Sequence, residues 1–139
     1  MKVIVCNIGS TSFKFQLVDM DGEHVLARVH IDRVGSENAL GRYYRGMDEL
    51  VVQEERPVES QREAVRSGLA FLTNEGIEEL SNVDAVGFKA VQAGEKSFTV
   101  IIDDSVLAAM EEYNDLAPAH IPAYLAAMRM FGELMSGKA

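Results

Sequence analysis

The sequence contains one cysteine, three prolines and no tryptophan. A single cysteine excludes an intrachain disulfide framework and a zinc site built from several thiolates, and it fits a reducing compartment. Cys6 lies in the apolar run 3–6, so we expect it to pack in the core. Few prolines and a charged fraction of 25% argue against disorder. The 139 residues, of which 47% are hydrophobic, therefore predict one globular domain over 1–139.

Long apolar runs and an excess of basic residues are also missing. No uninterrupted apolar stretch approaches the length of a bilayer span, and the N-terminus has no signal-peptide pattern. Acidic residues outnumber basic residues by 22 to 13, which gives a formal charge of -9. Such a surface repels polyanions. We therefore expect a cytoplasmic protein with no nucleic-acid partner and no membrane partner.

The first part of the chain predicts strands. Residues 2–8 form a β-branched apolar run, which is typical of a central strand covered on both faces. Residues 12–18 alternate between apolar and polar, as in a half-buried strand. A hairpin signal at Asp21-Gly22 leads into a third strand over 24–31, so the opening is a three-stranded antiparallel meander. Residues 36–56 predict an additional hairpin.

A helix and a further strand are predicted next. Pro57 predicts the start of a helix near 58–73, with Gly76 just past its end. Its core stripe is Val65, Leu69 and Leu72. Residues 83–91 predict a strand that runs parallel to the first strand, because a helix connects the two.

The last part of the chain predicts two more helices. Residues 98–102 predict a short strand, after which Asp103 or Asp104 caps a helix. Pro122 suits the first turn of a final helix. The apolar face of that helix is Tyr124, Leu125, Met128, Phe131 and Met135. The order of elements predicts an α/β domain with a mixed sheet and flanking helices.

The segment with the most chemical information is Asn7-Ile8-Gly9-Ser10-Thr11-Ser12-Phe13-Lys14. A turn containing glycine exposes backbone N–H groups, three hydroxyls add donors, and Lys14 projects from the same strand face as Ser12. Phosphoryl transfer needs an anion-binding turn of this kind, because the protein must position the transferring group and neutralise its negative charge. Spacing alone leaves a second interpretation open, an ordinary Gly-Ser hairpin with a solvated lysine.

This segment resembles the N-terminal phosphate motif of the acetate and propionate kinase family, Asn-x-Gly-Ser-Ser-Ser-x-Lys, with Thr11 in place of the middle serine. The resemblance spans essentially the whole chain. It implies a ribonuclease-H-like domain of the actin, sugar-kinase and hsp70 ATPase superfamily. Four further segments follow in the family's order: Val34-Gly35, Arg62-Glu63-Ala64, residues 84–87 leading to Gly94-Glu95, and residues 116–120.

The same resemblance implies an ATP-dependent, magnesium-dependent transfer of phosphate to a short-chain carboxylate such as acetate or propionate. The asparagine, serines and lysine of the motif would lie around the phosphates and the metal, and a histidine would assist the transferring group. Taken by itself, a histidine beside two prolines is more often a loop residue. The implied roles are phosphate binding by Asn7, Ser10, Ser12 and Lys14, magnesium contact by Asn7, catalysis by Lys89 and His120, and a substrate-pocket position at Val91.

The sequence also departs from the family. Residues 87–95 read Gly-Phe-Lys-Ala-Val-Gln-Ala-Gly-Glu where the family reads Gly-His-Arg-Val-Val-His-Gly-Gly-Glu. Lys89 keeps the charge of the family's arginine without its planar fork. Family members also continue into a second domain. We therefore expect an isolated chain that is inactive and self-associates, or that pairs with a second polypeptide in a split kinase. The alternative is a catalytically degenerate interaction or regulatory module.

Overall fold

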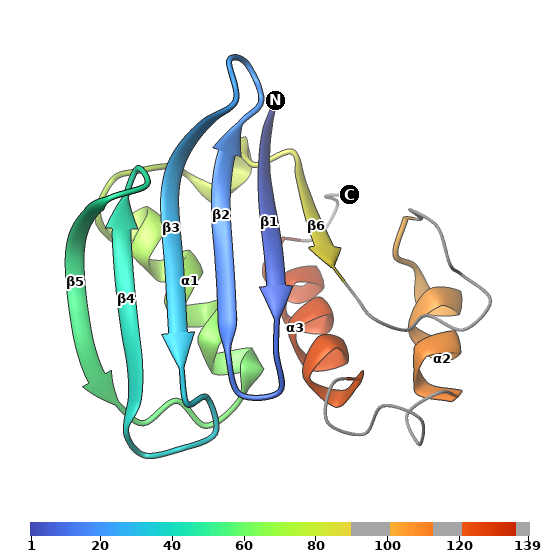
Figure 1. The fold of residues 1–139 in the computed structure, drawn as a ribbon. Helices are drawn as coiled ribbons and strands as arrows, with labels where there is room; N and C mark the ends of the chain where they lie inside the picture. The colour runs from blue at the N-terminus through green and yellow to red at the C-terminus, as the bar shows by residue number, and fades with distance from the viewer. Residues whose placement is uncertain (90–100, 113–120, 136–139) are drawn as a thin grey trace.

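The computed structural model describes residues 1–89, 101–112 and 121–135. Its main feature is a six-stranded mixed sheet with the order β5-β4-β3-β2-β1-β6 (Figure 1). Both the predicted α/β class and the mixed sheet are confirmed. The strands are β1 (Lys2–Ile8), β2 (Phe13–Asp19), β3 (His24–Asp32), β4 (Ala39–Arg45), β5 (Glu49–Arg56) and β6 (Ala85–Lys89).

The first five strands form one antiparallel meander, in which each strand pairs with the next along the chain. The predicted three-stranded meander is confirmed, and the predicted hairpin over 36–56 extends it by β4 and β5. Gly22 has a φ of +85°, the left-handed conformation that the Asp21-Gly22 signal predicts for this turn. β6 pairs with β1 in parallel, as predicted from the intervening helix.

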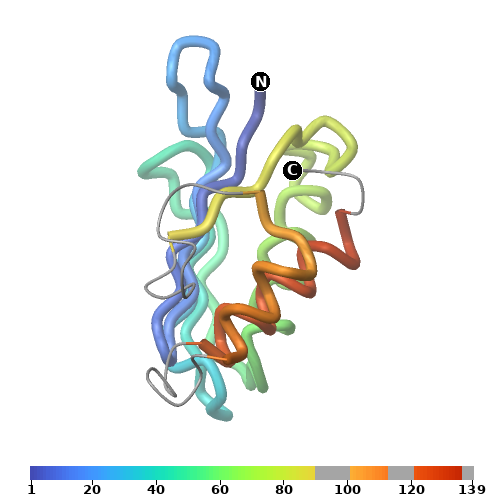
Figure 2. Tube along the Cα trace, turned by 90° about the vertical axis from the view of Figure 1, so that its right-hand side faces the viewer, coloured from blue at the N-terminus to red at the C-terminus, as the bar shows by residue number. Residues whose placement is uncertain are grey.

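Helices cover one face of the sheet. They are α1 (Gln61–Asn74), α2 (Asp104–Glu112) and α3 (Ile121–Leu134), and a short 3-10 turn, η1, spans Leu80–Asn82. In Figure 2 the sheet lies to one side and the helices to the other. Within the described ranges, the opposite face of the sheet carries no helix (Figure 1). We call it the open face.

The open face corrects one prediction. The strand over residues 2–8 was expected to be covered on both faces, but β1 is buried on one face only. Ile4, Cys6 and Ile8 point into the core, whereas the side chain of Val5 is 48% exposed. A continuous apolar run specifies burial only when elements pack on both sides of the sheet. In the described residues, the helices pack on one side.

The start of α1 is a second correction. The helix begins at Gln61, three residues after the predicted first residue, 58. Ser60 is the N-cap, and its side chain accepts a hydrogen bond from the N–H of Glu63 at 3.5 Å. A serine followed three residues later by a glutamate is a capping signal, and it prevails here over the proline. The predicted apolar stripe is buried, and Gly76 follows the helix with a φ of +64°.

Most of the remaining predictions hold where the structure describes the chain. Asp103 caps α2, because its Oδ1 accepts from the N–H of Val106 at 3.0 Å. Pro122 lies in the first turn of α3, and the predicted apolar face of this helix is buried. Of the short strand predicted over 98–102, only residues 101–102 lie among the described residues, and neither is in a strand.

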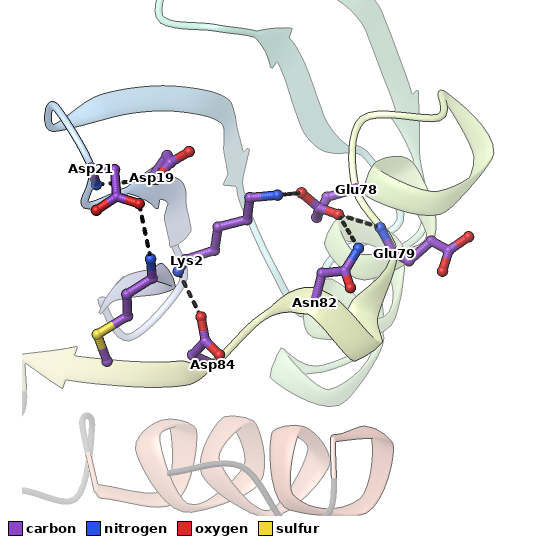
Figure 3. Close-up of polar contacts among 8 residues, drawn as sticks. Lys2, Asp19, Asp21, Glu78, Glu79, Asn82 and Asp84 are labelled. Atoms are coloured by element: carbon purple, nitrogen blue, oxygen red, sulfur yellow. Dashed lines mark hydrogen bonds and ion pairs between the residues drawn. The ribbon is translucent and has the colours of Figure 1, made fainter.

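A polar cluster joins the N-terminus to the segment that leads into β6 (Figure 3). The backbone N–H of Lys2 donates to Asp84 Oδ2 at 2.8 Å, and the Asp84 N–H donates to the Lys2 carbonyl, also at 2.8 Å. The Lys2 ammonium pairs with Glu78, and Glu78 also accepts from the side chain of Asn82 at 2.8 Å. These contacts fix the register in which β6 begins beside β1.

The core lies between the sheet and the helices α1 and α3. Phe88 of β6 packs edge to face on Phe131 of α3, with ring centroids 5.5 Å apart. Elsewhere in the core, α1 approaches β2 so closely that a Cβ atom on Gly68 would lie 2.6 Å from the Phe15 ring. Within the described ranges, none of the helices combines the length and the hydropathy that a bilayer span requires.

Candidate functional site

Three of the predicted site residues are immediate neighbours on the open face. Asn7 is the Cα partner of Lys14 on β2 and of Lys89 on β6. Residues that face each other across neighbouring strands project on the same side of a sheet, about 5 Å apart. The structure therefore brings together Asn7, Lys14 and Lys89, which are 82 residues apart in sequence at most.

The turn between β1 and β2 supplies backbone donors beside these side chains. One internal hydrogen bond closes it, from the Gly9 N–H to the Ser12 carbonyl at 3.0 Å. Within the described residues, the N–H groups of Ser10, Thr11 and Ser12 have no acceptor. Unpaired, neighbouring N–H groups in a turn are able to bind an anion. The turn therefore leaves three neighbouring backbone donors available.

Because Gly9 has no side chain, the Ser12 hydroxyl can approach its backbone closely in this turn. A Cβ atom at this position would lie 2.5 Å from the Ser12 Oγ atom. Ser12 is half-buried, whereas Ser10 and Thr11 are exposed. The Ser12 hydroxyl therefore folds back over the turn, and the other two hydroxyls face solvent.

The turn is held from outside by two other segments. The Thr11 carbonyl accepts from the Val34 N–H at 2.8 Å. The side-chain amide of Gln61, the first residue of α1, donates to the carbonyls of Gly9 and Ser12 at 3.4 and 3.2 Å. Val34 belongs to one of the segments that carry the family resemblance, and Gln61 directly precedes another. Segments that are far apart in sequence thus meet at the turn.

Sequence reasoning missed Gln61. Its side chain is only 4% exposed, and its Oε1 atom is buried without a hydrogen-bond partner in the described structure. A buried polar side chain with one unsatisfied atom is costly, so its two contacts with the turn are what compensate for its burial. A glutamine directly after the N-cap, next to the segment Arg62-Glu63-Ala64, was the only sequence signal.

Two of the predicted site residues, Val91 and His120, lie outside the described residues. Cys6 is free and fully buried, and burial raises the pKa of its thiol well above the usual value. A neutral, inaccessible thiol fits the predicted packing role. No group of three or more His, Cys, Asp or Glu residues able to hold a metal occurs among the described residues.

A groove of about 470 Å³ lies between the helices, lined by Arg62, Glu111, Pro122, Leu125, Ala126 and Arg129. Both of its arginines are already paired. Arg62 makes two bonds to Glu133, at 2.9 and 3.1 Å, and Arg129 pairs with Glu111. A carboxylate therefore already offsets the charge of each guanidinium. The groove is therefore a weaker candidate for a phosphate site than the turn and the open face.

The fold and the turn together define a domain of the actin, sugar-kinase and hsp70 ATPase superfamily. A crystal structure of Porphyromonas gingivalis acetate kinase superimposes with a TM-score of 0.85 at 32% identity, covering 98% of this chain and 35% of that one. A propionate kinase from Francisella tularensis shares the fold, with a TM-score of 0.79 at 21% identity and coverage of 99% and 35%. The model of the acetokinase family matches residues 2–138, and the chain belongs to that family.

Proteins of similar sequence support the same family assignment. Acetate kinase of Agathobacter rectalis is 39% identical over 139 residues, which cover 97% of this chain and 34% of that protein. This chain therefore spans about a third of the length of the curated relatives that it matches.

Proposed function

We propose that this chain forms the N-terminal domain of an ATP-dependent short-chain carboxylate kinase, which converts acetate and ATP to acetyl phosphate and ADP. Family membership supports the reaction type. The observation that carries the site is the adjacency of Asn7, Lys14 and Lys89 beside a turn with unpaired N–H groups. Together they offer donors and positive charge to one oxyanion, which is what phosphoryl transfer requires of a protein.

Each residue of the site has a defined role in this proposal. The N–H groups of the turn and the hydroxyls of Ser10 and Ser12 bind the oxygens of the phosphoryl group. Lys14 neutralises its charge, and Lys89 takes the place of the family's arginine. A lysine is a point charge that cannot bind two oxygens through a planar fork. We therefore expect Lys89 to support slower transfer than arginine at the same position.

ATP and Mg²⁺ are the proposed cofactors. Asn7 offers one neutral side-chain oxygen to the metal, and the described residues supply no carboxylate cluster beside it. Magnesium bound in this way keeps most of its waters and relies on the phosphates of the nucleotide. Asn7 would then be a single contact to a metal that arrives with ATP, and the metal would supply charge to shield the phosphates next to Lys14.

We further propose that residues 1–139 act as one domain of a cytoplasmic protein and need more chain to be active. His120 at the transferring group and Val91 in the carboxylate pocket complete this domain's share by family resemblance. The remaining groups would come from a second domain or a second polypeptide, and the isolated chain is expected to self-associate. Each missing charge-stabilising group is worth about 100-fold or more in rate.

The test is complementation. The 139-residue chain is mixed with a polypeptide that covers the remaining two thirds of a matched acetate kinase, and acyl phosphate is trapped as hydroxamate from acetate and ATP. We expect no product from the chain alone, product from the mixture, and none with Lys14→Ala. Arg66→Ala, an exposed change on α1, serves as the matched control and should retain turnover. Full turnover with Lys14→Ala would refute the assignment of the site.

A second candidate is an interaction module that has lost catalysis. One observation favours it. Phe88 stands where the family has a histidine, and its ring packs on Phe131 in the core. That position therefore contributes to stability and no longer to chemistry. A mixture in which the two polypeptides bind each other tightly without forming acyl phosphate, even with Lys89→Arg, would favour this module.

A further inference from the structure

A row of polar side chains crosses the open face at right angles to the strands. In sheet order it consists of Lys89, Asn7, Lys14, His30 and Arg42, one residue from each of β6, β1, β2, β3 and β4. Each is the Cα partner of the next, so all five project from the same face. Four strand spacings separate its ends, about 19 Å. We call it the basic row.

The cations of the basic row are unusual because they have no partners. Among the described residues, Lys14, Arg42 and Lys89 make no ion pair and no side-chain hydrogen bond. The other described lysine and arginines all make one. Six of them pair with carboxylates: Lys2, Arg45, Arg56, Arg62, Arg66 and Arg129. Arg28 and Arg33 donate to backbone carbonyls.

This distribution runs against the charge of the chain. With 22 acidic and 13 basic residues, a cation on this surface has an excess of carboxylates available to it. Asn7 and His30 separate the three cations, so neighbouring cations lie two strand spacings apart, and their mutual repulsion at about 10 Å is weak but unfavourable. Three unpaired cations in one row therefore cost stability unless an anion neutralises them. The proposed phosphate site accounts for Lys14 and Lys89, and it leaves Arg42 unexplained.

We propose that Lys14, His30 and Arg42 form a second oxyanion subsite, which takes a phosphate-type group. Lys14 and Arg42 lie two strand spacings apart, about 10 Å, with His30 between them. Two long cationic side chains on either side of a shorter one leave a position above the histidine within reach of both. The subsite goes beyond the proposed function, because it would bind its ligand whether or not phosphoryl transfer occurs.

His30 is held in place for this role. Its Nε2 atom lies 2.9 Å from Asp32 Oδ1, and its side chain is 25% exposed. That contact fixes the ring. In an imidazole that donates through Nε2, Nδ1 is an acceptor, and it can take a hydrogen bond from the P–OH group of a phosphate. The acidic groups nearest to the subsite on this face are Asp32 itself and Glu55 on β5, which is the Cα partner of Leu40. Both lie beside the row and not in it, so the ligand sits on the line between Lys14 and Arg42.

The test uses inorganic phosphate and the complete 139-residue chain, followed by ¹H–¹⁵N correlation spectra at low ionic strength. We expect two groups of amide shifts that saturate independently, one over residues 9–14 and one over residues 28–44. Arg42→Gln should weaken the second group roughly three- to fivefold, the upper range for one exposed ionic contact. The phosphate affinity reported by the first group should change by less than about twofold, which is the size of an ordinary surface effect.

Two variants separate a site from general electrostatics. Lys14→Gln should weaken both groups of shifts, because Lys14 is shared. Arg66→Gln removes the same charge from α1 and should weaken neither. If Arg42→Gln and Arg66→Gln behave alike, or if shifts appear over residues 9–14 alone, the second subsite does not exist. The proposed kinase function would survive that result, since it depends on residues 9–14 and on complementation.

Discussion

The Gln61 side chain donates to the carbonyl oxygen of Ser12 at 3.2 Å, across 49 residues of sequence. The contact ties the first residue of α1 to the turn that carries the proposed phosphate-binding N–H groups. The second contact of the same amide, to Gly9, spans the other side of the turn. Gln61 therefore couples the shape of the turn to the packing of the helix.

Replacing Gln61 tests this coupling. Gln61→Leu keeps the volume, loses both hydrogen bonds and relieves the buried, unpartnered Oε1 atom, so we expect a loss of about 1 kcal/mol. Gln61→Glu places a carboxylate against two carbonyl oxygens to which it has no proton to donate. We expect a loss of about 2–4 kcal/mol at pH 7. Urea denaturation measures both.

The pH dependence distinguishes the two variants. Burial raises the pKa of a carboxyl group, so the penalty of Gln61→Glu is present above the folded-state pKa and declines as the pH falls through it. When it is protonated, the carboxyl group of this variant can again donate a hydrogen bond to these carbonyl oxygens. We expect the stability of Gln61→Glu to approach that of Gln61→Leu near pH 4. A constant difference between pH 7 and pH 4 would show that Gln61 does not face these carbonyls.

Gly9→Ala should separate stability from binding. The new Cβ atom would overlap the Ser12 hydroxyl, which escapes by rotating about its side-chain bond. We expect less than about 1 kcal/mol of destabilisation. Displacing the hydroxyl should weaken inorganic phosphate binding by roughly three- to tenfold. The double variant Gly9→Ala/Ser12→Ala should bind no more weakly than Ser12→Ala; a further loss would mean that Gly9 acts through the backbone.

Gly68→Ala should destabilise the fold although alanine favours helices. The propensity gain of about 1 kcal/mol is outweighed by overlap of the new Cβ with the buried Phe15 ring, which typically costs about 1–3 kcal/mol. Gly132→Ala in α3 is the matched control. A Cβ there meets nothing within 4 Å, so this variant should gain stability. Thermal melts of both variants measure the difference, and a gain for Gly68→Ala would contradict the close approach of α1 to β2.

The Lys2–Glu78 pair predicts a defined pH window. The hydrogen bond with Lys2 is the main reason why the pKa of Glu78 is lowered from its usual value of 4.5, and the same contact raises the pKa of Lys2 from 10.5. The contribution of Glu78 is present above pH 4.5 and is lost as the pH falls through its lowered pKa. The contribution of Lys2 is present below pH 10.5 and is lost as the pH rises through its raised pKa.

We expect Glu78→Gln to lower stability between these limits, and the difference from the unaltered chain to shrink as the pH falls through the lowered pKa of Glu78. Glu79→Gln, a change at the neighbouring exposed carboxylate, is the control and should have little effect. Urea denaturation over this pH range measures both variants. Equal stability of Glu78→Gln and the unaltered chain at pH 7 would show that the pair contributes nothing in solution.

Local signals in the sequence predicted much of the fold. The alternation of Phe13 with polar neighbours, the Asp21-Gly22 turn and the cap at Asp103 each act over a few residues, and the structure has all three features. The family motif also brought Asn7 and Lys14 into one hypothesis before their pairing was known. Their roles in binding remain predictions.

The features that were missed depend on long-range packing. The exposure of Val5 depends on which face of the sheet the helices pack against, and the residues of the strand alone do not determine that face. The burial of Gln61 depends on how α1 meets the first turn. The basic row requires the register of four strand pairs, because Lys89 and Arg42 have no neighbours in sequence that suggest a common line.

The anchoring of the first turn by Gln61 and Val34 has a kinetic consequence. Two elements of the fold already restrict the conformations of residues 9–12 before any ligand arrives, so association should need little rearrangement of the loop. An encounter with phosphate would then be limited by diffusion and charge rather than by slow closure. The isolated domain would therefore bind phosphate without a conformational change in the turn.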